Sequence, residues 1–213
     1  QEYGEALSAV LPLETKDESR VNKMGVNASL IGVGGGGTRA FDNGSLSVDL
    51  NCQDLRLYDR MYSGRREFAK PYRMRSGAAQ FRYTPGRATV LKVYAQYDRT
   101  DFSAYEGDAR RLFALGENNA YVNATLRRHT SRGWDCFAGA SYSRYDRRID
   151  GAATPGDRWT ERQQELHLKL KAARHRLSAF RLDMGLESYL RRYRQAYLLA
   201  EARHLRRLQP AVC

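Results

Sequence analysis

Apolar and polar residues alternate with a period of two through most of the chain. The segment 165–172 shows this most sharply, because His167 and Lys169 separate Leu166, Leu168 and Leu170. In a strand, successive side chains point to opposite faces, whereas in a helix these polar residues would spiral through the apolar face. The alternation predicts β-strands at about 24–33, 37–42, 45–58, 74–83, 88–98, 119–128, 134–146, 159–172 and 178–192.

Turn-forming residues fall between these segments. Asn43-Gly44 predicts a type I′ hairpin turn, whose two central residues need positive φ, and 84–87 predicts a second tight turn at Pro85-Gly86. Longer polar segments at 59–73, 99–118 and 147–158 alternate with these short connections. The sequence therefore predicts an all-β antiparallel meander with short turns at one end and long loops at the other.

One apolar and one polar face per strand are typical of a soluble sandwich and also of a membrane barrel. Long loops gathered at one end favour the barrel. So do the 14 tyrosines, several of which lie near predicted strand ends, as Tyr83, Tyr97 and Tyr142 do, because aromatic residues line the membrane interfaces of such barrels. No continuous apolar run approaches the roughly 18 residues that a transmembrane helix needs.

The chain is strongly basic, with 36 Lys and Arg against 24 Asp and Glu and a net charge of +12. The segment 174–213 contains nine arginines and three acidic residues, a net charge of +6. Interleaved Tyr and Arg, best seen at 191–194, are also typical of nucleic-acid binding. The other charges lie along polar strand faces with acidic residues among them, as in a solvated lumen. A soluble basic β-protein that binds nucleic acid or another acidic partner is therefore the alternative function.

Other motifs predict no enzyme, cofactor or metal site. Cys52, Cys136 and Cys213 are far apart and odd in number, and no pair of histidines has metal-ligand spacing. Residues 32–37 satisfy G-x-G-x-x-G, but a predicted strand and turn follow them, not the helix that a dinucleotide site needs. We expect these glycines to form a hairpin connection at 34–37 or a strand segment of small residues. His167 is predicted to lie on the polar face of its strand.

Residues 2–16 read EYGEALSAVLPLETK. This segment resembles the end of the plug domain of TonB-dependent outer-membrane receptors, whose pattern is roughly E-Y-G-x-A-x-G-G-V-I-N-I-x-T-K. Small residues at 8 and 9 replace the glycine pair, and Pro12 replaces the usual Asn. The segment 94–103 is similar to receptors of Bacteroides-type bacteria. Identical positions without a gap are Glu2, Tyr3, Gly4, Ala6, Val10, Thr15 and Lys16.

The resemblance implies a plug-domain end at 1–19 and part of a transmembrane β-barrel at 20–192, with about nine strands of the roughly 22 in such receptors. The chain is then expected to be an internal fragment that does not transport by itself. An atypical Arg-rich tail follows at 193–213, where alternation is lost and a helical pattern is favoured. A shifted reading frame or truncated gene, and a long outer loop, are both open explanations for it.

The resemblance also implies energy-coupled uptake of a scarce ligand, such as an iron chelate, cobalamin or a glycan, across the outer membrane. Implied partners are the TonB complex (through a part of the receptor other than these residues), outer-membrane lipid, a surface lipoprotein and the ligand, but no nucleic acid. Aromatic and basic residues of the expected outer loops are the candidate ligand contacts: Tyr62, Arg65, Arg66, Tyr72, Tyr105 and Arg110.

Overall fold

The computed structural model describes residues 21–62, 68–106, 111–151, 154, 156–174 and 182–199. These residues form one short helix, α1 (Arg56–Met61), and otherwise almost entirely strands. The predicted all-β class and the predicted number of strands are confirmed. The strands are β1 (Lys23–Ser29), β2 (Gly32–Phe41), β3 (Gly44–Asp54), β4 (Phe68–Gly86), β5 (Thr89–Glu106), β6 (Arg111–His129), β7 (Trp134–Asp150), β8 (Arg158–Arg174) and β9 (Leu182–Leu198).

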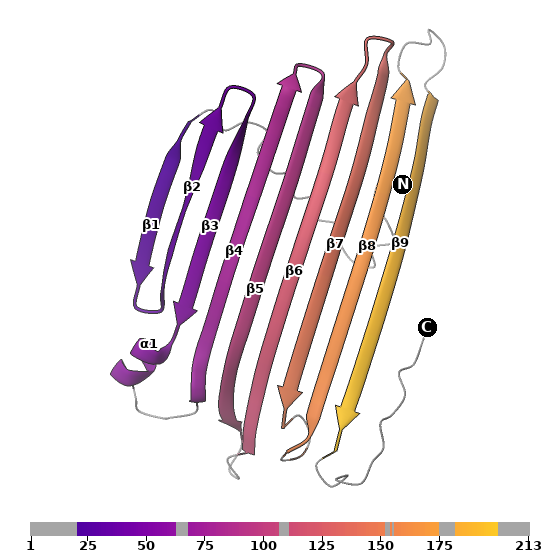
Figure 1. Cartoon of the computed structure of the whole chain (residues 1–213). Helices are drawn as coiled ribbons and strands as arrows, with labels where there is room; N and C mark the ends of the chain where they lie inside the picture. The colour runs from indigo at the N-terminus through magenta and orange to yellow at the C-terminus, as the bar shows by residue number, and fades with distance from the viewer. Residues whose placement is uncertain are drawn as a thin grey trace.

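All nine strands belong to one antiparallel sheet in which each strand pairs with its neighbours in sequence. The described strands form a single layer (Figure 1). We call the end of the sheet that carries α1 the α1 end; the β1–β2, β3–β4, β5–β6 and β7–β8 connections lie there. The opposite end, with the β2–β3, β4–β5 and β6–β7 turns, is the tight-turn end. Within the described residues, β1 and β9 each pair on one side only.

The β2–β3 hairpin has a two-residue connection at Asp42-Asn43, one position earlier than predicted. Phe41 pairs with Gly44, which is already part of β3. A Cβ on Gly44 would lie 2.1 Å from the carbonyl oxygen of Arg82. Glycine is therefore required here because the backbone of β4 approaches closely, and not because the turn needs positive φ at this residue.

The first hairpin connection is at Leu30-Ile31, so the prediction of a connection at 34–37 is wrong. Gly34 and Gly37 lie within β2 and pair with β1 and β3 on either side. The alternative expectation, a strand segment of small residues, is confirmed. Glycine favours turns in a single sequence, but here the pairing of two flanking strands keeps the segment extended.

The strands are longer at the α1 end than predicted. Segments 68–73, 99–106, 111–118 and 147–150 were expected in loops but extend β4, β5, β6 and β7. Alternation of apolar with polar residues fails in these extensions because each face carries both apolar and polar residues, as Leu112 and Phe113 on opposite faces of β6 show. A period of two persists in the charges, as in Arg144, Asp146, Arg148 and Asp150 of β7. In these extensions the charge pattern indicates a strand where the hydropathy pattern does not.

Two further boundaries differ from the prediction. The strand expected at 45–58 ends at Asp54, where the carboxylate accepts a hydrogen bond of 3.0 Å from the backbone N–H of Arg56 and α1 begins. The expected tail at 193–213 begins too early, because β9 continues as a strand to Leu198. The plug-domain end at 1–19 and the rest of the tail, 200–213, lie outside the described residues.

Candidate membrane interface and ligand-contact residues

One face of the sheet, which we call the apolar face, carries most of the aliphatic residues of the described strands. The register places cross-strand neighbours on the same face, so rows of residues can be followed across the sheet. A central row includes Leu46, Phe81, Val93 and Leu168. The next row toward the α1 end consists of Met24, Gly37, Val48, Ala79, Ala95, Val122, Tyr142, Leu166 and Leu190.

The apolar face has no covering layer among the described residues. None of the described hydrophobic residues is buried. Leu170 and Leu186 pair across β8 and β9 and keep 52% and 66% of their surface exposed. In a sandwich a second sheet would cover this face and remove such side chains from water. An apolar surface of this extent marks an interface, because soluble monomers rarely expose contiguous apolar patches larger than a few hundred Å².

Aromatic residues border the apolar rows. Tyr97 and Tyr142 lie toward the α1 end, while Phe41, Tyr83 and Trp134 lie toward the tight-turn end. Tyr97 is 49% exposed, and its hydroxyl donates to Asn118 Oδ1 at 3.2 Å on the charged side of the border. A ring with one apolar and one hydrogen-bonding end is suited to such a border.

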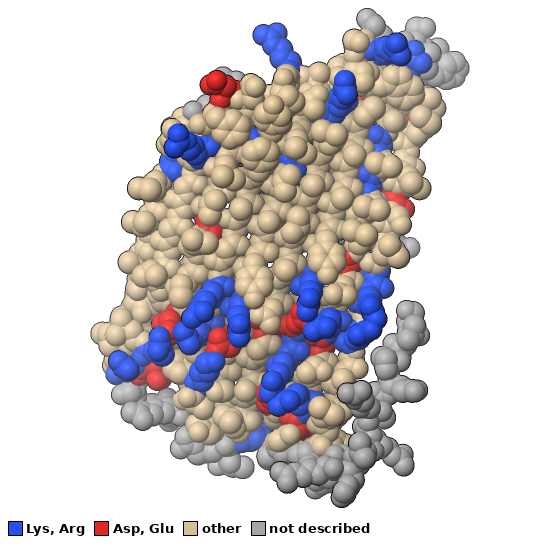
Figure 2. Space-filling model, viewed as in Figure 1, with Lys and Arg blue, Asp and Glu red and all other residues tan. Residues whose placement is uncertain are grey.

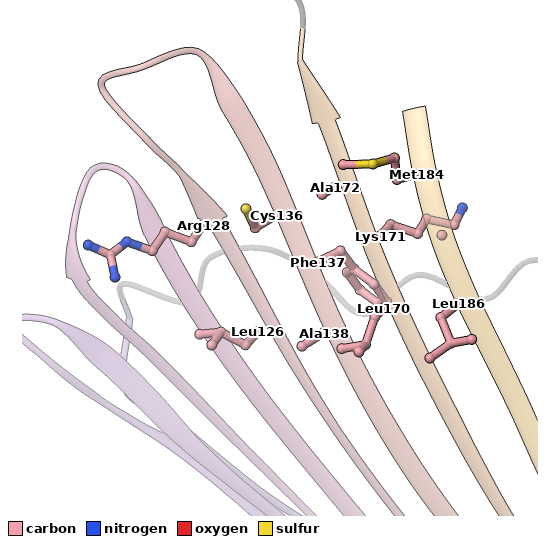
Figure 3. A pocket seen from close by; sticks show the side chains of 11 residues that line it. Leu126, Arg128, Cys136, Phe137, Ala138, Leu170, Lys171, Ala172, Met184 and Leu186 are labelled. Carbon is pink, nitrogen blue, oxygen red and sulfur yellow. The ribbon is translucent and has the colours of Figure 1, made fainter. Parts of the chain in front are cut away.

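A shallow apolar hollow lies on this face toward the tight-turn end. It spans β6–β9 and has a volume of about 490 Å³. Figure 3 shows Leu126, Ala138, Leu170 and Leu186 along its lower side, with Met184 nearer the turns. Its surface is mostly apolar, although Arg128, Cys136 and Lys171 also line it, so the hollow can accept an apolar chain.

The opposite face, which we call the polar face, is held by side-chain hydrogen bonds. Tyr94 donates to Gln96 at 2.7 Å, and Gln96 donates to Asp98 at 2.7 Å. His167 lies on this face, as predicted, with Nε2 at 2.8 Å from Glu187 and its ring 4.1 Å from that of Tyr189. Polar groups that satisfy one another in this way reinforce each other's hydrogen bonds and hold the side chains of this face in place.

Charged side chains gather toward the α1 end on the face shown in Figure 2. The register places Arg144, Asp146, Arg148 and Asp150 there, on the apolar face beyond the tyrosine border. Arg144 donates to Asp146 at 2.6 Å and Arg148 to Asp150 at 2.8 Å, and Arg158 of β8 donates to Asp150 at 2.6 Å. This charged zone adjoins the apolar rows on the same side of the sheet.

A second group of ion pairs stands at the end of β3. Asp54 accepts from Arg56 at 2.9 Å and contacts Arg73 at 3.3 Å. The hydrogen bond from Arg56, followed by smaller electrostatic contributions, holds the pKa of the Asp54 carboxyl below its usual value. The pair fixes the geometry where the chain leaves the sheet and enters α1.

The three predicted ligand contacts that the structure describes do not form one cluster. Tyr62 follows α1 and packs on Tyr58 with ring centroids 4.7 Å apart. Tyr72 lies in β4 on the polar face, where its ring is 6.2 Å from that of Phe102. Tyr105 lies in β5 on the apolar face and is 38% exposed, so the expectation that it belongs to a loop is wrong. The remaining three, at positions 65, 66 and 110, lie outside the described residues.

Sequence reasoning missed an aromatic cluster beside Tyr72. Phe102 and Phe113 lie on the polar face with tilted rings whose centroids are 6.1 Å apart, and Phe102 also contacts Tyr72. These phenylalanines lie in segments that were expected to be loops. Once β5 and β6 are known to extend through these segments, the register between the two strands places Phe102 and Phe113 on the same face.

Neither metal binding nor a membrane-spanning helix is found in the part of the chain that the structure describes. No group of three or more His, Cys, Asp or Glu side chains there is placed to hold a metal ion. No helix there is long and apolar enough to cross a membrane. Cys52 and Cys136 are free, exposed thiols.

The basic run at 191–194 is divided between the two faces. Arg191 points to the polar face and donates to Glu165 at 2.7 Å, whereas Arg192 and Arg194 lie on the apolar face. A continuous basic and aromatic surface of the kind expected for nucleic-acid binding is therefore not formed by this run.

No family model, curated protein or solved structure matches the chain. The family resemblance at 2–16 stays a prediction that depends on those residues.

Proposed function

We propose that the described sheet is part of the wall of a membrane β-barrel, with its apolar face toward lipid and its polar face toward the lumen. The observation that supports this proposal is the combination of two unlike faces. One exposes Leu, Val and Tyr side chains with no covering layer among the described residues, and the other is held by side-chain hydrogen bonds. Lipid is a medium in which an uncovered apolar face is stable.

We further propose that this wall belongs to a TonB-dependent outer-membrane receptor that takes up a scarce ligand by energy coupling. The plug-like segment at 2–16 and the antiparallel meander that follows it have the order found in that family. The α1 end would then face outward. Tyr62 and Tyr72 would be candidate contacts for an iron chelate, cobalamin or a glycan, with Arg65, Arg66 and Arg110 as further predicted positions; Tyr105, on the apolar face, would meet lipid instead.

Spin labels along β8 test the membrane proposal. Single nitroxides at 166–170 in the complete barrel that contains this chain, inserted in lipid vesicles, should collide with oxygen most often at Leu166, Leu168 and Leu170. Collisions with a water-soluble nickel chelate should be most frequent at His167 and Lys169. Equal access of the nickel chelate to both sets would contradict a lipid-facing apolar surface.

The family proposal has a separate test. The genomic DNA on both sides of this coding segment should encode a signal peptide and a plug domain before it, and about a dozen further alternating strands after it. Flanking sequence that encodes neither would contradict a receptor of this family, although the lipid-facing sheet could still stand.

A further inference from the structure

The charges at the α1 end are distributed unequally between the two faces. On the apolar face, the row of Gln164 and the rows beyond it toward the α1 end carry ten basic residues and four aspartates, a net charge of +6. On the polar face, the rows of Gln163, Glu161 and Trp159 cover the same part of the sheet. They carry one basic residue, Arg147, and three acidic residues, Asp98, Glu117 and Glu161. We call the ten the basic band: Lys70, Arg73, Arg75, Arg99, Arg144, Arg148, Arg158, Arg162, Arg192 and Arg194.

If the charged residues at the α1 end only kept the protein soluble, cations would be expected on both faces of the sheet. The cations lie on the face that also exposes the apolar rows, and the band begins where those rows end, as Figure 2 shows for one side of the sheet. Cations at the edge of an apolar surface match an amphiphile with an anionic headgroup.

Within the basic band, Arg75 and Arg99 are the best candidates to bind an external anion. They are direct cross-strand partners on β4 and β5, and both side chains are exposed. Their immediate neighbours in the same row are Cys52 and Asn118, so the nearest carboxylates on this face lie in the next row, at Asp54 and Asp101. Like charges directly opposite one another destabilise a sheet, and a bound anion removes that cost.

The aspartates nearest to this pair already have partners. In the next row outward, Asp54 is bound by Arg56 and Arg73, and Asp101 contacts Lys70. Arg75 and Arg99 form no ion pair with a described residue. The pair therefore keeps both positive charges available to an outside group.

The surface inward of this pair is apolar. The adjacent row contains Leu50, Gly77 and Tyr97. A hollow of about 930 Å³ extends from Arg75 across β1–β3 and is lined mostly by apolar surface, including Val26 and Leu50. Gly35 and Gly37 help to form it, because they bring no side chain to the apolar face of β2. The glycine run at 32–37, which satisfies the G-x-G-x-x-G motif, thus leaves a trough on the apolar face.

We propose that Arg75 and Arg99 bind the phosphate of an anionic membrane lipid whose acyl chains lie on the apolar rows and in this trough. The proposal rests on the proposed function, because it requires the apolar face to meet lipid. Arginine provides planar donors in a fork that matches two phosphate oxygens, which favours this headgroup over a zwitterionic one.

Cys52 offers a reporter next to the site, since it pairs with Arg75. In a full chain with Cys136→Ser and Cys213→Ser, an environment-sensitive fluorophore on Cys52 should respond when dihexanoyl phosphatidic acid is added to the chain in neutral detergent. Dihexanoyl phosphatidylcholine should bind at least tenfold more weakly. In a second chain with Cys52→Ser and Cys213→Ser, a fluorophore on Cys136, near the tight-turn end of the same face, should respond equally weakly to both lipids.

The variant Arg75→Gln/Arg99→Gln should lose about tenfold in affinity for each arginine, since a hydrogen bond to a charged group contributes that much. Arg75→Lys/Arg99→Lys keeps the charge but not the fork and should recover part of the loss. Arg87→Gln/Arg132→Gln is the matched control, because it removes two exposed turn arginines at the other end and should retain the affinity.

Four results would overturn the lipid site. They are equal binding of both lipids, equal loss in the turn control, displacement by inorganic phosphate at the same concentration as the lipid, and tighter binding of a single-stranded oligonucleotide with a steep salt dependence. None of these bears on the spin-label pattern of β8, so failure of the lipid site can be distinguished from failure of the proposed function.

Discussion

Arginine at Leu168 would separate a lipid-facing strand from one that faces water. Leu168 is 43% exposed in the middle of the apolar rows and pairs with Ala140 and Ser188. Complete burial of a leucine side chain is worth about 1.5–3 kcal/mol, so loss of its partial contacts in water would cost about 1 kcal/mol. At the midplane of a bilayer, a lipid-facing arginine costs about 2–4 kcal/mol. The free energy of unfolding should therefore fall by about 3 kcal/mol if the strand faces lipid.

The neighbouring residue provides the control. His167 lies on the polar face, 2.8 Å from Glu187, and an arginine in its place can keep a contact with that carboxylate. His167→Arg should change the free energy of unfolding by less than about 1 kcal/mol. The same charge is thus added one residue apart on opposite faces.

Denaturant titration of the complete barrel that contains this chain, in lipid vesicles and followed by tryptophan fluorescence, measures both variants against the unchanged protein. The difference between them should be about 2 kcal/mol, a factor of roughly 30 in the ratio of folded to unfolded protein. If Leu168→Arg is no more destabilising than His167→Arg, the assignment of the apolar face to lipid is wrong.

Three further predictions concern the connections. Gly44→Ala should destabilise the chain by about 1 kcal/mol or more in denaturant titration, because its Cβ would meet a backbone oxygen at 2.1 Å, whereas Gly86→Ala, with open space, should be nearly neutral. Asp157→Ala should cost about 1–3 kcal/mol in the same assay, because that fully buried carboxylate accepts a loop amide at 3.0 Å and a tyrosine hydroxyl of β9; an unchanged midpoint would refute this. The stabilising contribution of Asp54 should be complete above its ordinary pKa of 3.8 and disappear as the pH falls through its lowered pKa. In Arg56→Gln, NMR titration should show the pKa of Asp54 returning upward, and equal midpoints would refute that cause.

The sequence predicts the strands wherever one face is apolar. In β8 the expected 159–172 differs from Arg158–Arg174 by one residue at the start and two at the end, because leucines alternate with charged residues along most of its length. In β5 the expected 88–98 stops eight residues before Glu106, because beyond Asp98 polar residues occupy both faces. The hydropathy of residues 99–106 therefore shows no period of two, although the pairing of β5 with β6 continues through them without a register shift.

The candidate site is less predictable than the sheet. Tyr72 and Tyr105 have the residue type and the approximate end of the sheet that the prediction required, but they lie on opposite faces. A face is defined by register, and one register shift in the β4–β5 pairing near Lys70 is enough to change which residues are neighbours. The glycine run of β2 shows the same limit, since its role depends on strands that pair with it from both sides.

The edges of the sheet decide what kind of membrane structure these two faces allow. Within the described residues β9 pairs with β8 alone, over 17 residues, and β1 pairs with β2 alone. Each unpaired backbone group in the hydrocarbon region costs several kcal/mol, so these edges would offset what the apolar face gains from lipid. If the apolar face meets lipid, as proposed, the unpaired edges must be removed from the hydrocarbon region, and this happens when further strands pair with β1 and β9 and close the wall. For this reason we propose a barrel, and not an isolated sheet, as the membrane form.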